Sequence, residues 1–299
     1  MPDSGPILQI NSLTKSYGSV KALSNLNIEV NRGQVYGILG PNGSGKTTTL
    51  SILTGILEQD SGSFSWFGEK SKASTRRRIG SLIETPSFFP YLSLENNLKI
   101  IAQIKECKGD DIEDVLKLVK LYERRKSKFS TLSLGMKQRL GIASTLIGNP
   151  EVLVLDEPTN GLDPEGIAEV RELITQQSES GRTIIMASHI LSEVEKVCTD
   201  VAIFKSGHLL AQGNVKLLLA GAAVLQVKSA NEEELLTILK VCPFVKQFSG
   251  DKNGYNLILK EEHSSVDFNR YAFEKGVILS ELIMNQKSLE SQFLELVKG

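Results

Sequence analysis

The amino-acid sequence predicts an α/β fold in which a parallel sheet carries helices on both faces. Short apolar runs typical of buried strands, such as Val152–Asp156 and Thr183–Ala187, alternate with helical patterns. The run Gln34–Gly40 has the same buried character, and a glycine-rich loop and a helix predicted through Leu57 follow it directly. This order indicates an open α/β sheet, in which ligands bind at the carboxyl ends of the strands.

The residues before and after this loop add shorter strands. Leu26 and Ile28 alternate with polar neighbours in the half-buried strand predicted at residues 25–30. Residues 61–68 predict a hairpin with aromatic packing, and residues 78–83 predict another strand. We therefore expect sheet structure on both sides of the glycine loop.

A helical insert is predicted from about residue 90 to residue 150. Within it, Ile112, Val115, Leu116 and Val119 recur at the spacing of one apolar helix face. The strand–helix alternation then resumes, with helices predicted at about 164–180 and up to Cys198, and a strand at 201–205.

A second domain is predicted to begin near Gly221–Ala222. The patterns from there to the end follow the order βαββαβ, which predicts a small α+β appendage of ferredoxin-like type. We therefore divide the chain into residues 1–221, which include the helical insert, and residues 222–299. The elements predicted in the appendage are strands at 223–228, 244–249, 255–260 and 277–283, helices at 231–240 and 265–275, a turn at 251–254, and a last helix from Ser288.

The composition is that of an ordinary globular protein with two domains. Of the 299 residues, 40% are hydrophobic and 23% are charged, and the net charge of -1 gives no broad attraction for nucleic acid. No apolar run is long enough to span a membrane and the first residues do not resemble a signal peptide, so we expect a cytoplasmic location. Three scattered cysteines favour buried thiols over disulfides or a zinc site.

The glycine loop carries the most specific chemistry. The sequence GPNGSGKT matches G-x-x-x-x-G-K-[ST] between a buried strand and a helix, which is the context that a phosphate-binding loop requires. Backbone N–H groups of such a loop surround the phosphates, the lysine reaches the β- and γ-phosphates, and the hydroxyl after it holds Mg²⁺. A tight turn before a helix is the simpler alternative. The predicted ATP-binding residues of the loop are Gly40, Pro41, Asn42, Gly43, Ser44, Gly45, Lys46, Thr47 and Thr48.

Two adjacent acids follow a buried strand at the edge where ligands bind. Asp156 suits a Mg²⁺ ligand together with Thr47, and Glu157 suits a general base that polarises the attacking water. The pair could alternatively cap the following turn. Because the glycine loop lies upstream, we predict that the acids belong to a site for phosphate hydrolysis.

Four further motifs occur in an order that resembles the ATP-binding subunits of ABC transporters over roughly residues 7–220. TLSLGMKQ at 131–138 looks like the signature sequence, and NGLD at 160–163 looks like the loop that crosses the dimer interface. His189 looks like the catalytic switch histidine, and Tyr17 matches the aromatic residue that stacks on adenine. The resemblance implies a P-loop NTPase fold of ABC type with a mixed sheet core and a helical insert.

The resemblance also implies two partners. In the family, two copies pair head to tail, so that the glycine loop of one and the signature of the other enclose each ATP. Integral membrane permease subunits then use the movement of the pair, which implies a location on the inner face of the membrane. The signature here departs from the usual LSGGQ at its third and fifth positions. The implied interface residues are Ser133, Leu134, Gly135, Met136 and Asp163, of which Ser133 and Gly135 also contact ATP.

Glu84 is the single charge in the run IGSLIETPSFF, and a solvated strand end is the simplest interpretation. The family has a glutamine here that touches the metal and leads into the helical insert. A glutamate at this position is similar to the lantibiotic-immunity ATPases, and residues 79–98 and 288–297 also resemble the bacitracin-resistance group. We therefore predict that Glu84 is a metal-site residue that serves coupling more than chemistry.

The resemblance predicts the ATPase of an exporter for a peptide antibiotic, a lantibiotic or a similar amphiphile. A soluble ABC ATPase of assembly-factor type, without a membrane partner, remains the alternative. A nucleotide-gated module without turnover is disfavoured, because Glu157 and His189 are both present. The role of the appendage stays open.

Overall fold

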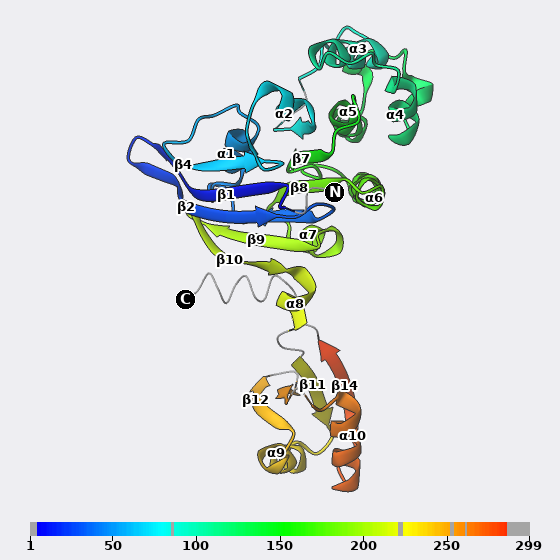
Figure 1. Ribbon diagram of the computed structural model, residues 1–299. Helices are drawn as coiled ribbons and strands as arrows, with labels where there is room; N and C mark the ends of the chain where they lie inside the picture. Colours follow the sequence, from blue (N-terminus) through cyan, green and yellow to red (C-terminus); the bar gives the residue numbers. More distant parts are fainter. Residues whose placement is uncertain (1–4, 85–86, 221–223, 252–253, 261, 286–299) are drawn as a thin grey trace. The chain divides into compact units, whose positions relative to one another are not determined.

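The computed structural model describes residues 5–84, 87–220, 224–251, 254–260 and 262–285 (Figure 1). The chain divides into two compact units, Met1–Val215 and Lys216–Gly299. The domain boundary predicted from the sequence, Gly221–Ala222, falls outside the described residues.

A six-stranded sheet forms the centre of the larger unit. All its neighbouring strands are parallel except β9 and β10, which pair antiparallel, so the sheet is mixed. Every residue of the three central strands is buried, as their continuous apolar sequences predict. The strand order is β10 (His208–Asn214), β9 (Asp200–Lys205), β3 (Val35–Leu39), β8 (Thr183–Ser188), β7 (Val152–Asp156) and β6 (Ile79–Leu82).

Strand β10 was not predicted from the sequence. It follows β9 through a two-residue turn at Ser206 and Gly207, whose φ angles are 49° and 79°. Positive φ at both positions is typical of the tight turns that join antiparallel strands. The Ser-Gly pair was the available signal for this hairpin.

A second, antiparallel sheet completes the larger unit. Its order is β2 (Val20–Val30), β1 (Leu8–Tyr17), β4 (Ser61–Trp66) and β5 (Glu69–Lys70), and the β4–β5 hairpin confirms the one predicted at residues 61–68. The sequence prediction omitted β1 and started β2 five residues late. Register shifts between the two strands and a positive φ at Ser12 break the alternation of apolar and polar side chains that identifies a strand.

Helices α1 (Lys46–Leu53), α6 (Pro164–Glu179) and α7 (Leu191–Val197) pack against the six-stranded sheet. The prediction that the first of them runs through Leu57 is wrong, because Gly55 adopts a φ of 79° and turns the chain away from the helix. Helix α7 approaches the sheet closely at Gly37, where a Cβ would lie 2.8 Å from Val194 Cγ1.

The helical insert lies at one end of the larger unit (Figure 1). Its α-helices are α3 (Leu94–Ile104), α4 (Ile112–Leu118) and α5 (Leu134–Leu146), and a short α2 (Ala73–Arg77) precedes β6. Two 3₁₀ turns, Tyr122–Arg124 and Phe129–Thr131, join α4 to α5. The predicted apolar stripe is confirmed, since its four residues Ile112, Val115, Leu116 and Val119 are all buried.

The smaller unit has the predicted order βαββαβ. Its antiparallel sheet runs β12 (Val245–Asp251), β13 (Gly254–Leu259), β11 (Val224–Ser229) and β14 (Leu279–Asn285), which is the ferredoxin-like arrangement. Helix α8 (Val215–Ala220) precedes the first of these strands in the chain. Helix α9 (Glu232–Val241) connects β11 to β12, and helix α10 (Ser265–Glu274) connects β13 to β14. The helix predicted from Ser288 and the middle of the turn at 251–254 lie outside the described residues.

The core of the smaller unit is a single apolar cluster that joins its sheet to α9 and α10. The cluster includes Leu225, Val227, Leu235, Leu239, Leu257 and Phe268, all buried.

In the part of the chain that the structure describes, no helix is both long enough and apolar enough to cross a membrane.

Candidate functional site

The glycine loop lies between β3 and α1, where the sequence predicted it. Gly43 and Gly45 have φ angles of 78° and 106°, which favour glycine. Gly40 is required for a different reason, since a Cβ there would lie 2.5 Å from the backbone oxygen of Phe204. The loop therefore has an open backbone that ends at the N-terminus of α1, a suitable place for phosphate groups.

Lys46 is buried beneath this loop, with 5% of its surface exposed. Its Nζ donates to the backbone oxygen of Gly40 at 2.9 Å and to that of Pro41 at 3.3 Å. The same nitrogen lies 3.3 Å from Glu157 Oε1. The glycine loop thus places a positive charge directly beside the acid that follows β7.

Asp156 is the last residue of β7, and its carboxylate is poorly satisfied. It is buried, and its Oδ1 has no hydrogen-bond partner among the described residues. Burial raises the pKa of the Asp156 carboxyl, a hydrogen bond with the Thr47 side chain opposes that rise, and the negative charge of Glu157 adds to it.

The residues around Asp156 fit a magnesium ion. The Asp156 carboxylate and the Thr47 hydroxyl are hard oxygen donors, the kind that Mg²⁺ prefers. The hydroxyl of Ser44, in the loop itself, is also buried and has no hydrogen-bond partner within the described parts of the chain. Such groups cost free energy unless a ligand satisfies them, so they are suited to a metal and phosphate oxygens.

Glu157 lies between a lysine and a histidine. His189 Nδ1 is 2.8 Å from Glu157 Oε2, and the backbone N–H of His189 donates to the same oxygen at 3.4 Å. Glu157 has a φ of 47°, a strained conformation for this residue type. Because β7 and β8 are parallel neighbours, the residues that follow them, Glu157 and His189, meet at one sheet edge.

A cavity of about 510 Å³ opens over the glycine loop. Tyr17, at the end of β1, has 49% of its surface exposed and forms part of the wall, as expected of a residue that stacks on a base. Val20–Ala22 and Ser206 also line it and were not singled out in the sequence. The available signals were the turn at residues 18–19, which precedes Val20, and the Ser-Gly turn that contains Ser206. The lining residues are Tyr17, Val20, Lys21, Ala22, Asn42, Gly43, Gly45, Lys46, Thr47, Thr48, Glu157 and Ser206.

Glu84 lies two residues beyond the end of β6, the neighbour of β7. Its side chain is exposed and its φ is 60°, another strained value for a residue other than glycine. Its negative charge contributes to the raised pKa of Asp156, so the two carboxylates interact. Residues 85 and 86, through which the chain leads from Glu84 toward the insert, fall outside the described residues.

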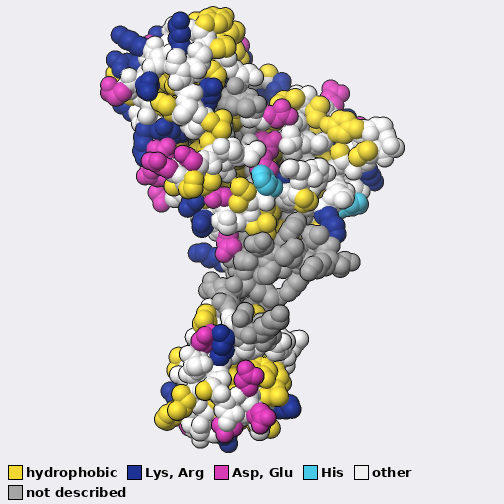
Figure 2. Space-filling view, turned by 180° about the vertical axis from the view of Figure 1, so that it is seen from behind, with side chains coloured by type: hydrophobic (Ala, Val, Ile, Leu, Met, Phe, Trp, Pro, Cys, Tyr) yellow, Lys and Arg dark blue, Asp and Glu magenta, His cyan; other side chains and the backbone are white. Residues whose placement is uncertain are grey.

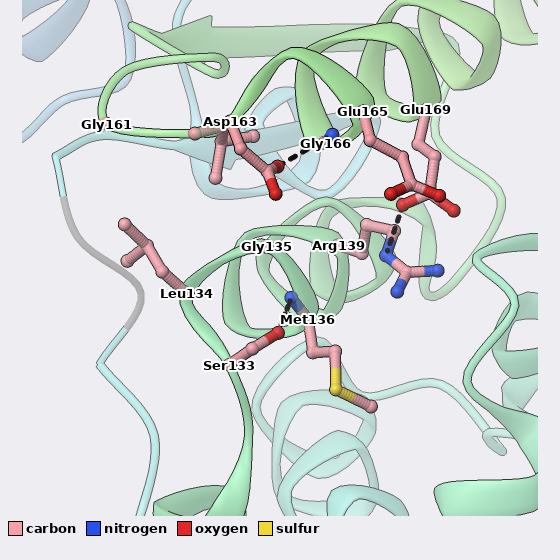
Figure 3. Close-up of a pocket in the computed structure, with 11 residues that line it drawn as sticks. Ser133, Leu134, Gly135, Met136, Arg139, Gly161, Asp163, Glu165, Gly166 and Glu169 are labelled. Carbon is pink, nitrogen blue, oxygen red and sulfur yellow. Dashed lines mark hydrogen bonds and ion pairs between the residues drawn. The ribbon is translucent and has the colours of Figure 1, made fainter.

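The signature and the NGLD loop meet in a second cavity of about 490 Å³ (Figure 3). Ser133 caps the N-terminus of α5, where its Oγ accepts a hydrogen bond from the Met136 backbone N–H at 3.3 Å. Asp163 caps the N-terminus of α6 in the same way, since its Oδ1 accepts from the Gly166 N–H at 2.9 Å. The lining residues are Ser133, Leu134, Gly135, Met136, Arg139, Gly161, Leu162, Asp163, Glu165, Gly166 and Glu169.

The two cavities have no lining residue in common. The structure thus gathers the glycine loop, Tyr17, Asp156, Glu157 and His189 in one region, and the signature and NGLD residues in another. Within one chain, Ser133 and Gly135 do not line the cavity over their own glycine loop.

Comparison with known proteins agrees with these motifs. The family model described as ABC transporter matches residues 23–160. The chain is 38% identical to the bacitracin transport ATP-binding protein BcrA of Bacillus licheniformis, over 98% of both chains. It is 42% identical to the lantibiotic transport ATP-binding protein SrtF of Streptococcus pyogenes, over 69% of this chain and 90% of that one.

A solved structure shares the fold. The structure of cbiO1 from Clostridium perfringens, part of the ABC transporter complex cbiONQ, covers 80% of this chain and 96% of its own, with 29% identity and a TM-score of 0.66. Identity and coverage at these levels extend well beyond the short motifs. The chain therefore belongs to the ATP-binding subunits of ABC transporters, and it is an ATPase.

Proposed function

We propose that two copies of this chain pair head to tail around two ATP molecules, and that hydrolysis separates them. The observation that carries the proposal is the division of the motifs between two separate cavities. The glycine loop supplies one half of a composite site, and the signature of a second copy supplies the other. Ser133 and Gly135 stand at the start of α5, where a hydroxyl and free N–H groups can bind a γ-phosphate.

We assign the chemistry of the site to residues at the sheet edge. Lys46 binds the β- and γ-phosphates, and Glu157 orients and polarises the attacking water as general base. His189, 2.8 Å from the Glu157 carboxylate, holds that group in place. Thr47, Asp156 and Glu84 are the proposed ligands of Mg²⁺, which neutralises phosphate charge when bound.

An aromatic surface on the helical insert supports a membrane partner. The rings of Phe89 and Tyr91 lie 6.0 Å apart and are 46% and 66% exposed, and those of Phe88 and Phe129 lie 5.1 Å apart. In the space-filling view, hydrophobic side chains lie among Lys and Arg side chains over the insert (Figure 2). Exposed apolar surfaces of this kind mark protein interfaces. We propose that permease subunits bind here and hold the chain on the cytoplasmic face of the membrane.

The transported substrate is proposed from the relatives alone. BcrA and SrtF are named for bacitracin and lantibiotic transport, so we propose export of a peptide antibiotic or a similar amphiphile. A soluble ABC ATPase without a membrane partner is the alternative. Purification of the tagged chain from membranes separates the two, because only the transporter subunit copurifies with integral membrane proteins.

The variant Glu157→Gln tests the pairing. Removing the general base slows hydrolysis by about a hundredfold or more but leaves the phosphate contacts intact, so ATP should hold the two copies together. Light scattering should then show a dimer with ATP and Mg²⁺ and a monomer with ADP. A variant that binds ATP yet stays monomeric contradicts the composite site.

A further inference from the structure

Leu134 departs from the family signature, which has glycine at this position, and its side chain reaches a part of the chain that a glycine could not reach. It is the first residue of α5, 53% exposed, and its side chain extends toward the loop that carries Gly161 (Figure 3). A Cβ added to Gly161 would lie 3.4 Å from Leu134 Cδ2, so the end of the Leu134 side chain lies beside the NGLD loop of its own chain. Both residues line the same cavity.

The NGLD loop is held internally by short turns. The N–H of Asn160 donates to Glu157 O at 3.1 Å, and that of Leu162 donates to Thr159 O at 3.3 Å. Between them, Gly161 has a φ of 75°, which favours glycine. These bonds close the loop on itself and do not attach it to α5.

A second contact joins the same two parts of the chain farther along. Arg139 of α5 and Glu169 of α6 form an ion pair, with 3.3 Å between Nε and Oε2, and both side chains are largely buried. The cavity of about 490 Å³ lies between this ion pair and the Leu134–Gly161 contact. Helix α5 thus approaches the NGLD loop at one side of the cavity and is joined to α6 at the other.

We infer that Leu134 is a positioning residue that fixes the NGLD loop relative to the signature helix. Ser133 and Asp163 are then presented to a second copy as one rigid surface, and this consequence rests on the proposed pairing of two copies. A glycine at position 134 leaves the two segments free to move independently at this end of the cavity.

Hydrogen exchange of the monomer without nucleotide tests the contact directly. Because the Leu134 side chain is about half buried, Leu134→Ala should speed exchange of the Asn160 and Leu162 amides by about fivefold. Leu134→Met, of similar size, should restore the parental rates. The matched control is Ile104→Ala, which removes another exposed apolar side chain and should leave both amides unchanged. Unchanged exchange in Leu134→Ala overturns the inference.

Dimer formation in the Glu157→Gln background supplies the second measurement. Leu134→Ala should raise the ATP concentration for half-maximal dimer about fivefold, and Leu134→Met should not. If the dimer weakens while exchange in the monomer stays unchanged, Leu134 acts on the partner directly and the inference is wrong. If the Glu157→Gln parent never dimerises, the proposed function fails, whereas the exchange experiment still decides the role of Leu134.

Discussion

Replacing Glu84 by glutamine removes one negative charge at the edge of the proposed metal site and leaves the side-chain size unchanged. Opposite unit charges about 4 Å apart attract by about 1 kcal/mol in water and by about 4 kcal/mol at an effective dielectric constant of 20. Glu84 is exposed, so the lower part of this range of attraction energies applies. A loss of about 1.4 kcal/mol corresponds to a tenfold decrease in a binding constant. We therefore expect Mg²⁺ to bind the ATP complex about tenfold more weakly, with ATP hydrolysis at saturating Mg²⁺ within about tenfold of the parent.

The effect on transport should be larger than the effect on hydrolysis. If Glu84 has the proposed role, bound Mg²⁺ should attract its carboxylate toward the site, whereas Asp156 and Glu157 should repel it after metal and phosphate leave. The chain leads from Glu84 into the helical insert, so this change from attraction to repulsion of the Glu84 carboxylate can move the insert. Glu84→Gln should therefore lower resistance of cells that carry the whole transporter by more than it lowers the ATPase rate.

The assay is paired: the ATPase rate of the purified chain across Mg²⁺ concentrations, and drug resistance of cells. Glu84→Asp, which keeps the charge on a shorter side chain, is the matched control and should keep most of the Mg²⁺ affinity. If hydrolysis falls as far as in Glu157→Gln, Glu84 is a catalytic residue and the coupling argument is refuted. If neither quantity changes, Glu84 is a solvated strand end.

Two other predictions concern the nucleotide cavity and the smaller unit. Tyr17→Ala should weaken ATP binding by about fivefold to a hundredfold with little change in kcat, because base stacking contributes about 1–3 kcal/mol, whereas Tyr17→Trp should retain affinity. Titration with a fluorescent ATP analogue measures this, and equal affinities in all three proteins exclude a stacking role. Deleting residues 222–299 should change ATP affinity by less than about fivefold, which corresponds to about 1 kcal/mol, since Ser206 is the last residue that lines the nucleotide cavity. Loss of binding by a truncated chain with a native circular dichroism spectrum contradicts this domain assignment.

Local chemistry made the glycine loop and the central strands predictable. Residues 40–47 are contiguous, and their glycines, lysine and threonine are needed in that order for one purpose. The continuous apolar runs of β3, β7 and β8 require burial on both faces, which a parallel sheet under helices provides. Strand β1 escaped prediction because its register shifts interrupt the period of two.

Contacts between distant residues could be read only from the folded chain. Glu157 and His189 are 32 positions apart, and they meet because β7 and β8 are neighbours in the sheet. Neither the strand order nor the contact of Leu134 with Gly161 follows from spacing along the chain, because packing of whole elements sets both. The amino-acid order thus specified the chemical groups and the elements that carry them, and the packing of those elements specified which groups meet.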